Sequence, residues 1–131
     1  MTEPLEPTTQ SRFVQSIGCE FGHDADGTPW VRLEVQEMHR NSNRVVHGSV
    51  IHALLDSAMG REAYRARGKR PIATAEISVR FLAPVFDGVL EARARVLKAG
   101  KRLVFAEGQV RHDGELVAVG QGTFAAIGDD K

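Results

Sequence analysis

The chain of 131 residues contains one cysteine, has no net charge and lacks any long apolar run. A single cysteine, Cys19, excludes an intrachain disulfide framework and fits a reducing compartment, so we expect a cytoplasmic protein in which this thiol is a small buried residue. Lysine plus arginine equals aspartate plus glutamate, which argues against a general nucleic-acid binder. No stretch approaches the length of a membrane span, and residues 1–10 lack the basic and apolar regions of a targeting signal.

Several catalytic motifs are also missing. The sequence has no Gly-x-Ser-x-Gly nucleophile elbow, no glycine-rich phosphate loop and no motif around its cysteine. Internal repeats, low-complexity tracts and a second-domain boundary are absent too. The length suits one domain, small enough that an oligomer would help to bury surface. We expect residues 1–10 to form a flexible tail and residues 11–131 to form a single domain.

The first half of the sequence predicts two short strands and a central helix. Ser11 can cap a short helix that stops at Gly18, and strands are expected over residues 19–21 and 30–36. A mostly polar loop then leads to the central helix, for which Ser49 is a plausible N-cap and Gly68 the end.

The second half predicts a meander of long strands. Residues of alternating polarity mark four of them, and Asp113-Gly114 is a strong hairpin signal between the last two. In the first of these strands, one face is expected to carry Ala73, Ala75, Ile77, Val79 and Phe81. One helix followed by four antiparallel strands gives an α+β domain.

The central helix carries a carboxylate, Asp56, in an almost wholly apolar stretch. The apolar residues between Val50 and Ala63 leave little polar surface, so we predict an enclosed helix with Asp56 partly or wholly out of water. Burying a carboxylate costs free energy unless it gains hydrogen bonds, a nearby cation or a raised pKa. Such acids gather at active sites, although Asp56 could also face a solvent gap or pair with His52 one turn earlier.

The tripeptide His47-Gly48-Ser49 lies where this helix begins. The N–H groups and positive dipole end of a helix N-terminus form a natural seat for a developing oxyanion. Glycine lets a substrate approach the backbone closely. The turn is therefore both a cap and a candidate oxyanion hole.

The spacing between Gly48 and Asp56 bears on the number of subunits. They are eight residues apart, which at about 1.5 Å per residue is roughly 12 Å along one helix. One reacting carbonyl needs both its oxyanion donor and its base or nucleophile at about 3 Å. If both groups serve one reaction, a second subunit must supply one of them, most simply through a two-fold axis. We therefore expect a homodimer.

The motif Asn41-(five residues)-His47-Gly48-(seven residues)-Asp56, followed by TAEISVRFLAP at residues 74–84, resembles the hotdog-fold acyl-CoA thioesterases. The resemblance is to the branch associated with phenylacetate degradation, and it extends from about residue 31 to residue 124. It implies a long antiparallel sheet wrapped around one central helix. It also implies hydrolysis of acyl-CoA at the interface of a homodimer, and a dimer of dimers as the larger assembly.

The resemblance implies roles for five catalytic residues. Asp56 becomes the nucleophile or general base, and Gly48 the N–H donor to the thioester oxygen, with His47 supporting the turn. Asn41 matches an amide that holds the substrate carbonyl or the water. Thr74 matches a hydroxyl that orients the water or the acid.

Four further residues are candidates for substrate binding: Ser49, Arg70, Arg80 and Arg102. Many family members have glycine where this chain has Ser49, which keeps the backbone N–H but changes the shape of the channel. Basic residues near the helix end could hold the CoA phosphates or could simply be solvated, namely Arg61, Arg65, Arg67, Lys69 and Arg70. The same two readings apply to Lys98, Lys101 and Arg102.

The same residues allow functions other than thioester hydrolysis. His47, His52 and Asp56 lack a recognised three-ligand spacing, so we expect no metal, and no cofactor besides the CoA of the substrate. His39 is expected to be exposed or structural. A hotdog hydratase or dehydratase would use a histidine together with Asp56. A non-catalytic acyl-CoA binding module would keep the pocket without the chemistry.

Overall fold

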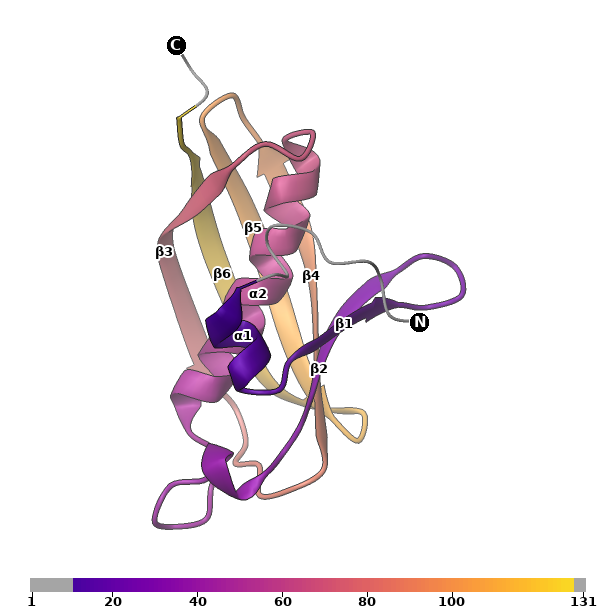
Figure 1. Cartoon of the computed structure of the whole chain (residues 1–131), viewed down its shortest axis with the longest axis vertical. Helices are drawn as coiled ribbons and strands as arrows, with labels where there is room; N and C mark the ends of the chain where they lie inside the picture. Colours follow the sequence, from indigo (N-terminus) through magenta and orange to yellow (C-terminus); the bar gives the residue numbers. More distant parts are fainter. Residues whose placement is uncertain (1–10, 129–131) are drawn as a thin grey trace.

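The computed structural model describes residues 11–128, so the tail predicted for residues 1–10 lies outside the described residues. Figure 1 shows a long helix, α2, lying across one face of a single sheet. In chain order the elements are α1 (Arg12–Ser16), β1 (Glu20–His23), β2 (Pro29–Glu34), the 3-10 turn η2 (Glu37–His39), α2 (Gly48–Ala66), β3 (Ile72–Phe81), β4 (Val89–Ala99), β5 (Leu103–His112) and β6 (Glu115–Ala126).

Six antiparallel strands form the sheet in the order β1-β2-β4-β5-β6-β3. Strands β4, β5 and β6 follow one another as predicted, but β3 pairs with β6, so the meander is wrong at β3. Strands β3 and β4 are not neighbours in the sheet, so the segment between them is not a tight hairpin. Within this segment, the Val85 carbonyl accepts a hydrogen bond from the Val46 N–H just before α2. The β3 strand therefore forms one edge of the sheet, and the four-residue β1 the other.

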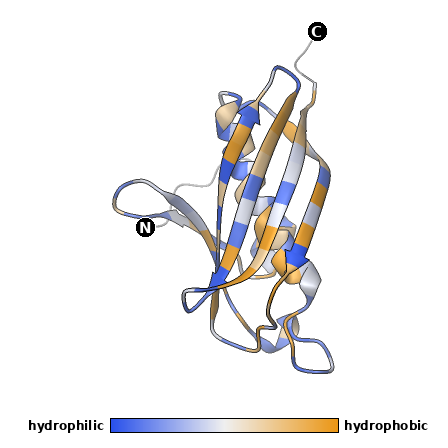
Figure 2. Cartoon of the chain, turned by 180° about the vertical axis from the view of Figure 1, so that it is seen from behind, coloured by the Kyte–Doolittle hydropathy of each residue, from blue (hydrophilic) through white to orange (hydrophobic). Residues whose placement is uncertain are grey.

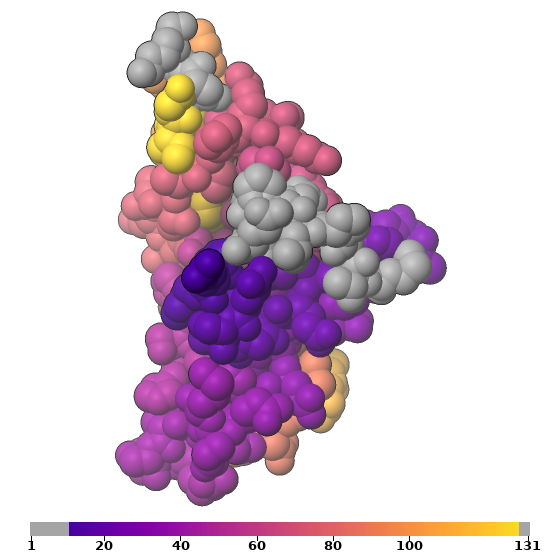
Figure 3. Space-filling view, in the orientation of Figure 1, coloured from indigo at the N-terminus to yellow at the C-terminus, as the bar shows by residue number. Residues whose placement is uncertain are grey.

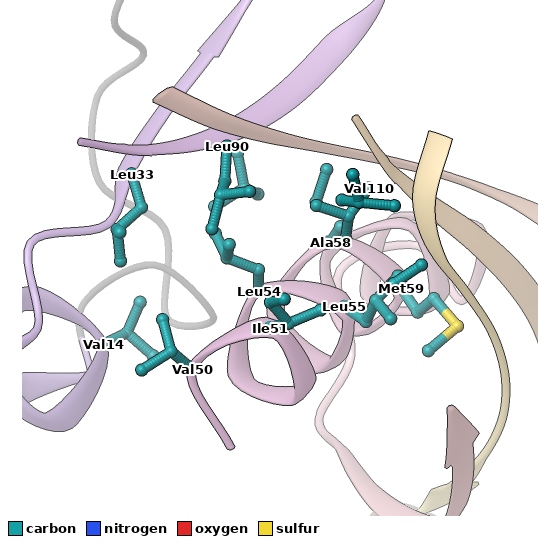
Figure 4. Packing of buried hydrophobic residues seen from close by; sticks show 14 of the residues in the cluster. Val14, Leu33, Val50, Ile51, Leu54, Leu55, Ala58, Met59, Leu90 and Val110 are labelled. Carbon is teal, nitrogen blue, oxygen red and sulfur yellow. The ribbon is translucent and has the colours of Figure 1, made fainter. Parts of the chain in front are cut away.

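The core lies between α2 and the inner face of the sheet. Figure 4 shows apolar side chains of α2, among them Leu54, Leu55 and Met59, gathered against the strands. These three are fully buried, as predicted for an enclosed helix. Burying a side chain of this size contributes roughly 1.5–3 kcal/mol, so the packing of α2 is a major source of stability.

Strands β5 and β6 each carry a glycine directly beneath Leu55 of α2. A Cβ atom added to Gly108 would lie 3.0 Å from Leu55 Cδ2, and one added to Gly120 would lie 3.1 Å from Leu55 Cδ1. Both distances are shorter than ordinary packing contacts. The two glycines therefore allow α2 to lie closer to the sheet than any side chain would permit.

The two faces of the sheet differ in what covers them. Figure 3 shows that the segment from α1 to the loop before α2, coloured indigo to purple, covers the lower half of the helix side. Figure 2 shows the opposite, outer face, with bands of polar and apolar residues and no helix over it. On this face Arg93 bonds to Asp24 at 2.8 Å and to Glu91 at 2.7 Å, which ties the β1–β2 turn to β4. The hydrogen bond from Arg93 also lowers the pKa of Asp24.

Candidate active site

The N-terminal end of α2 has no side-chain cap. The helix begins at Gly48, and its N-cap is His47, whose side chain makes no capping hydrogen bond. The predicted N-cap, Ser49, is wrong, because Ser49 already lies in the first helical turn. The first N–H groups of a helix have no acceptor inside the helix, so those of Gly48 and Ser49 point outward. Such an end attracts negative charge.

A buried histidine, His39, holds the turn that leads to this helix end. Its Nδ1 accepts a hydrogen bond from the Gln36 N–H at 2.8 Å, so Nε2 carries the ring proton and donates to the Ile17 carbonyl at 2.6 Å. The His39 carbonyl accepts the His47 N–H at 2.8 Å. His39 is only 1% exposed, so of the two predictions for it the structural one is correct and the exposed one is wrong.

Asn41 organises the loop between η2 and α2. Its Oδ1 accepts hydrogen bonds from the backbone N–H groups of Asn43 at 2.8 Å and Val45 at 3.2 Å. This is an Asx turn, which occupies the carbonyl half of the amide. The NH₂ half makes no hydrogen bond within residues 11–128, so it is the half that can meet a ligand.

Asp56 lies in the third turn of α2 and is half-buried. The Thr74 hydroxyl donates a hydrogen bond of 2.8 Å to Asp56 Oδ1, so the carboxylate is bonded to β3 rather than to His52. A β-bulge makes this contact possible, because the pairing of β3 with β6 shifts register between Thr74 and Glu76. Thr74 therefore faces α2 on the same side as Ile77. The strict alternation predicted for residues 73–81 is wrong at the start of the strand.

The two proposed catalytic groups lie apart within one chain. Gly48 and Asp56 are in the same helix, eight residues or about 12 Å from each other along its axis. Thr74 lies beside Asp56, whereas the neighbour of Gly48 is Phe81 at the end of β3. A Cβ atom added to Gly48 would lie 3.0 Å from Cζ of the Phe81 ring. Phe81 had no predicted role at the site, since its only signal in the sequence was its place within the family motif.

Both groups border an unpaired strand edge. β3 has ten residues, all of them exposed or half-buried, and none of them is proline. Natural proteins keep edge strands short or block them, because a long edge presents free N–H and C=O groups to another strand. Within residues 11–128, the β3 edge therefore presents backbone N–H and C=O groups that no neighbouring strand pairs with.

The four predicted substrate-binding residues do not gather in one place. Ser49 lies at the open end of α2. Arg80 alternates with the inward-facing residues of β3 and lines a groove on the outer face of the sheet. Arg70 donates a hydrogen bond from Nε to the Arg67 carbonyl at the far end of α2, and Arg102 lies in the β4–β5 turn.

Two basic residues predicted to be solvated, or to hold phosphates, are buried instead. Arg61 is 1% exposed, and its Nη1 donates to the carbonyls of Gly22 and Trp30, both at 3.2 Å. Burial lowers the pKa of Arg61 to about 10. Arg67 is 4% exposed and donates to the Pro71 carbonyl at 3.0 Å. Both side chains fix α2 to its surroundings.

The described residues hold few other reactive groups. Cys19 is half-buried, and burial raises the pKa of its thiol to about 11. Residues 11–128 contain no group of three or more His, Cys, Asp or Glu residues arranged to hold a metal ion. Within the same residues, no helix combines the length and hydropathy that crossing a membrane would need.

Comparisons with known proteins identify the family. The model of the thioesterase superfamily matches residues 43–119. A Caenorhabditis elegans protein named as a putative esterase is 35% identical over 98 residues, which span 72% of this chain and 58% of that protein. Protein BH2602 of Bacillus halodurans, solved with CoA, superposes with a TM-score of 0.86 at 29% identity, covering 91% of this chain and 80% of that one. A variant of the phenylacetic acid degradation protein PaaI of Thermus thermophilus gives a TM-score of 0.77 at 27% identity, covering 89% and 100%.

This chain belongs to the thioesterase superfamily. Its six-stranded antiparallel sheet with one long helix is the hotdog fold, so the predicted fold and the predicted resemblance are both confirmed. Family membership and the esterase name of a relative support a thioester hydrolase in general terms.

Proposed function

We propose that this protein hydrolyses acyl-CoA thioesters at the interface of a homodimer. The observation that carries the proposal is the hydrogen bond from Thr74 to the half-buried Asp56, on a helix whose N-terminal end is left without a cap. The CoA bound to the Bacillus halodurans relative supports CoA as the thiol. The proposed roles of Asp56, Gly48, His47, Asn41 and Thr74 are those that the family resemblance implies.

The reaction starts with the thioester oxygen at the open end of α2. The Gly48 N–H donates to this oxygen and stabilises the negative charge that develops when the carbonyl carbon is attacked. The attacking group is either Asp56 of the partner subunit or a water molecule that Asp56 deprotonates. The C–S bond then breaks and CoA leaves as a thiol. Where Asp56 attacks directly, water hydrolyses the resulting acyl-enzyme anhydride.

Thr74 gives the carboxylate its orientation in this proposal. Its hydroxyl donates to Oδ1 of Asp56, which leaves Oδ2 for the water or the carbonyl carbon. The backbone of His47 is fixed by the His39 carbonyl, which holds the donor end of the helix in place. The amide NH₂ of Asn41 is the group that would hold the substrate or the water.

The dimer follows from pairing at the β3 edge. In the proposed dimer, a two-fold axis beside β3 would run the two α2 helices antiparallel and bring Gly48 of one chain opposite Asp56 of the partner subunit. On the outer face, the exposed apolar residues Leu97, Leu103 and Phe105 are candidates for the contact between two dimers. Arg70, Arg102 and Ser49 remain proposed contacts for the CoA moiety.

The direct test is release of CoA thiol from a panel of aromatic and aliphatic acyl-CoA thioesters. In the Asp56→Ala and Asp56→Asn variants, kcat should fall by about 10³-fold, because a positioned base or nucleophile is lost. Sedimentation of each variant shows whether the dimer is retained. An unimpaired rate in a folded Asp56→Ala dimer would refute the assignment.

A complementation experiment tests the shared site. Asp56→Ala subunits are mixed with Gly48→Pro subunits, which lack the backbone donor, and the chains are allowed to exchange. Each mixed dimer then holds one intact site and one doubly impaired site, so about a quarter of wild-type activity should return. If Gly48 and Asp56 of the same chain served one site, no activity would return.

A further inference from the structure

Phe81 lies against the residue that the proposed function makes the oxyanion donor. The three atoms nearest to a Cβ placed on Gly48 all belong to the Phe81 ring, at 3.0, 3.4 and 3.5 Å. The ring therefore occupies the space that any side chain at position 48 would need. It also remains 51% exposed, so one part of it touches the helix end and another part faces outward.

The backbone around Phe81 is fixed. Phe81 pairs with Ala118 at the last position of the β3–β6 ladder, and the next residue, Leu82, donates to the Val117 carbonyl at 2.8 Å. Only rotation of the side chain can move the ring away from Gly48. The ring is thus held in place beside the open end of α2.

A bound thioester would contact the Phe81 ring at one specific atom of its acyl group. When its carbonyl oxygen accepts the Gly48 N–H at about 3 Å, the second carbon of the acyl group lies only two bonds from that oxygen. Among the described residues, the side chain nearest to a Cβ placed on Gly48 is the Phe81 ring, so it is the side chain of this protomer that the second carbon would approach. A hydrogen atom on this carbon fits beside an aromatic ring, whereas an added methyl group requires the ring to move.

We propose that Phe81 determines substrate specificity by favouring acyl groups that are unbranched at the carbon next to the carbonyl. The inference rests on the proposed function, because it needs the thioester oxygen to lie on Gly48. It goes beyond that function by naming a class of acyl group and the side chain that selects it.

The test compares butyryl-CoA with isobutyryl-CoA, which have equal numbers of carbon atoms but differ in branching at this position. We expect the wild-type protein to prefer butyryl-CoA in kcat/KM. Phe81→Ala should shift the ratio toward isobutyryl-CoA by about tenfold or more, the usual effect of one methyl group in an apolar site. Phe81→Leu gives the same readout with less loss of packing, should the alanine variant fail to fold.

Phe86 supplies the matched control. It is also a phenylalanine, lies in the segment just after β3 and is 52% exposed. Phe86→Ala removes the same ring without touching Gly48, so it should leave the ratio between the two substrates unchanged. A general loss of stability or of packing would change the rates of both substrates together in either variant.

Energetic coupling between Gly48 and Phe81 gives an independent readout. Alanine at position 48 places a methyl group 3.0 Å from the ring, so Gly48→Ala should lower kcat/KM in the wild-type background. In the Phe81→Ala background the space is free, and the same substitution should cost much less. Equal costs in the two backgrounds would contradict the contact on which the proposal rests.

The outcomes separate this inference from the proposed function. If the wild-type protein hydrolyses either substrate but Phe81→Ala and Phe81→Leu keep the wild-type ratio, the inference is wrong and the proposed function stands. If no thiol is released from these two substrates or from the aromatic and aliphatic panel, the proposed function is wrong. The dissociation constants of both thioesters in Asp56→Asn then decide the inference, which is overturned unless Phe81→Ala added to that variant shifts their ratio toward isobutyryl-CoA.

Discussion

At the C-terminal end of α2 the last carbonyl groups are bonded within the chain, whereas at the N-terminal end the first N–H groups are left open. The Arg67 N–H bonds to the carbonyls of Ala63 and Tyr64, and the Gly68 N–H bonds to that of Arg65. At the other end, His47 provides no side-chain cap. The hydrogen bonds at the C-terminal end stabilise the fold, whereas the free N–H groups at the N-terminal end are available to bind a ligand.

Of the two ends of α2, the open end should show the larger effect on the rate when its backbone donor is removed. Proline suits the first position of a helix, and His47, with φ −56° and ψ 137°, has the extended backbone that a residue before proline needs. Gly48→Pro should therefore keep the helix but lower kcat about 10²–10³-fold relative to Gly48→Ala. The alanine variant is the matched control, since it carries a Cβ against Phe81 but retains the N–H. Thiol release and circular dichroism report the two properties, and equal rates in both variants would contradict the oxyanion role.

A change in the C-terminal half of α2 should alter stability and leave the chemistry intact. Arg61→Ala removes a buried side chain and its bonds to the carbonyls of Gly22 and Trp30, so the free energy of unfolding should fall by about 2–4 kcal/mol. Urea denaturation measures the loss. Lys101→Ala, at an exposed turn, is the control and should stay within about 0.5 kcal/mol. A tenfold loss of kcat in folded Arg61→Ala would show that the two ends are not separate in function.

Between the two ends, the bond from Thr74 to Asp56 should have an intermediate effect. Thr74→Val keeps the shape of the side chain but removes the donor, so kcat should fall about tenfold, as expected for a hydrogen bond to a charged group. Thr74→Ser retains the hydroxyl and should stay near the wild-type rate. A rate in Thr74→Val equal to that in Thr74→Ser would leave the hydroxyl without a role in orienting the acid.

An effect on thiol reactivity rather than on kcat is expected at Cys19, which follows the α1 segment that supports the open end. Burial raises the pKa of its thiol from 9.0 to about 11, so the folded chain holds this proton more tightly than the unfolded chain. The resulting stabilisation is present below pH 9 and is lost as the pH rises toward 11. At pH 8 iodoacetamide should alkylate the native thiol about 100-fold more slowly than the urea-unfolded thiol. Similar rates in both states would mean that the α1 segment opens readily.

Local patterns were sufficient to predict much of the fold. The dense apolar stretch predicted the enclosed helix α2, because a helix without a polar face has to be covered on several sides. The hairpin at Asp113 and Gly114 is confirmed, since both residues adopt positive φ values of 50° and 81°, as such a turn requires. The pairing of β3 with β6 was not predictable, because it depends on contacts between residues far apart in the sequence.

In the candidate site, too, some features were predictable from neighbouring residues and others were not. The start of the helix at residues 47–49 and the partly buried Asp56 followed from the type and spacing of neighbouring residues, whereas the predicted cap by Ser49 was wrong. That Thr74 orients the water or the acid was implied only by the family resemblance, because the contact with Asp56 depends on a bulge, which inserts one residue without a distinctive sequence. The buried position of His39 was missed because its partners come from three separate segments.

The glycines beneath α2 have a consequence for how this protein can evolve. A methyl group at Gly108 or Gly120 would lie 3.0 or 3.1 Å from a methyl group of Leu55, the residue immediately before Asp56, so Leu55 would have to shift by a few tenths of an ångström. A shift that carried the backbone of α2 with it would lengthen the 2.8 Å hydrogen bond between the Thr74 hydroxyl and Asp56. Substitutions at these two glycines are thereby linked to the position of the acid, because the space above each glycine is filled by the residue that precedes Asp56.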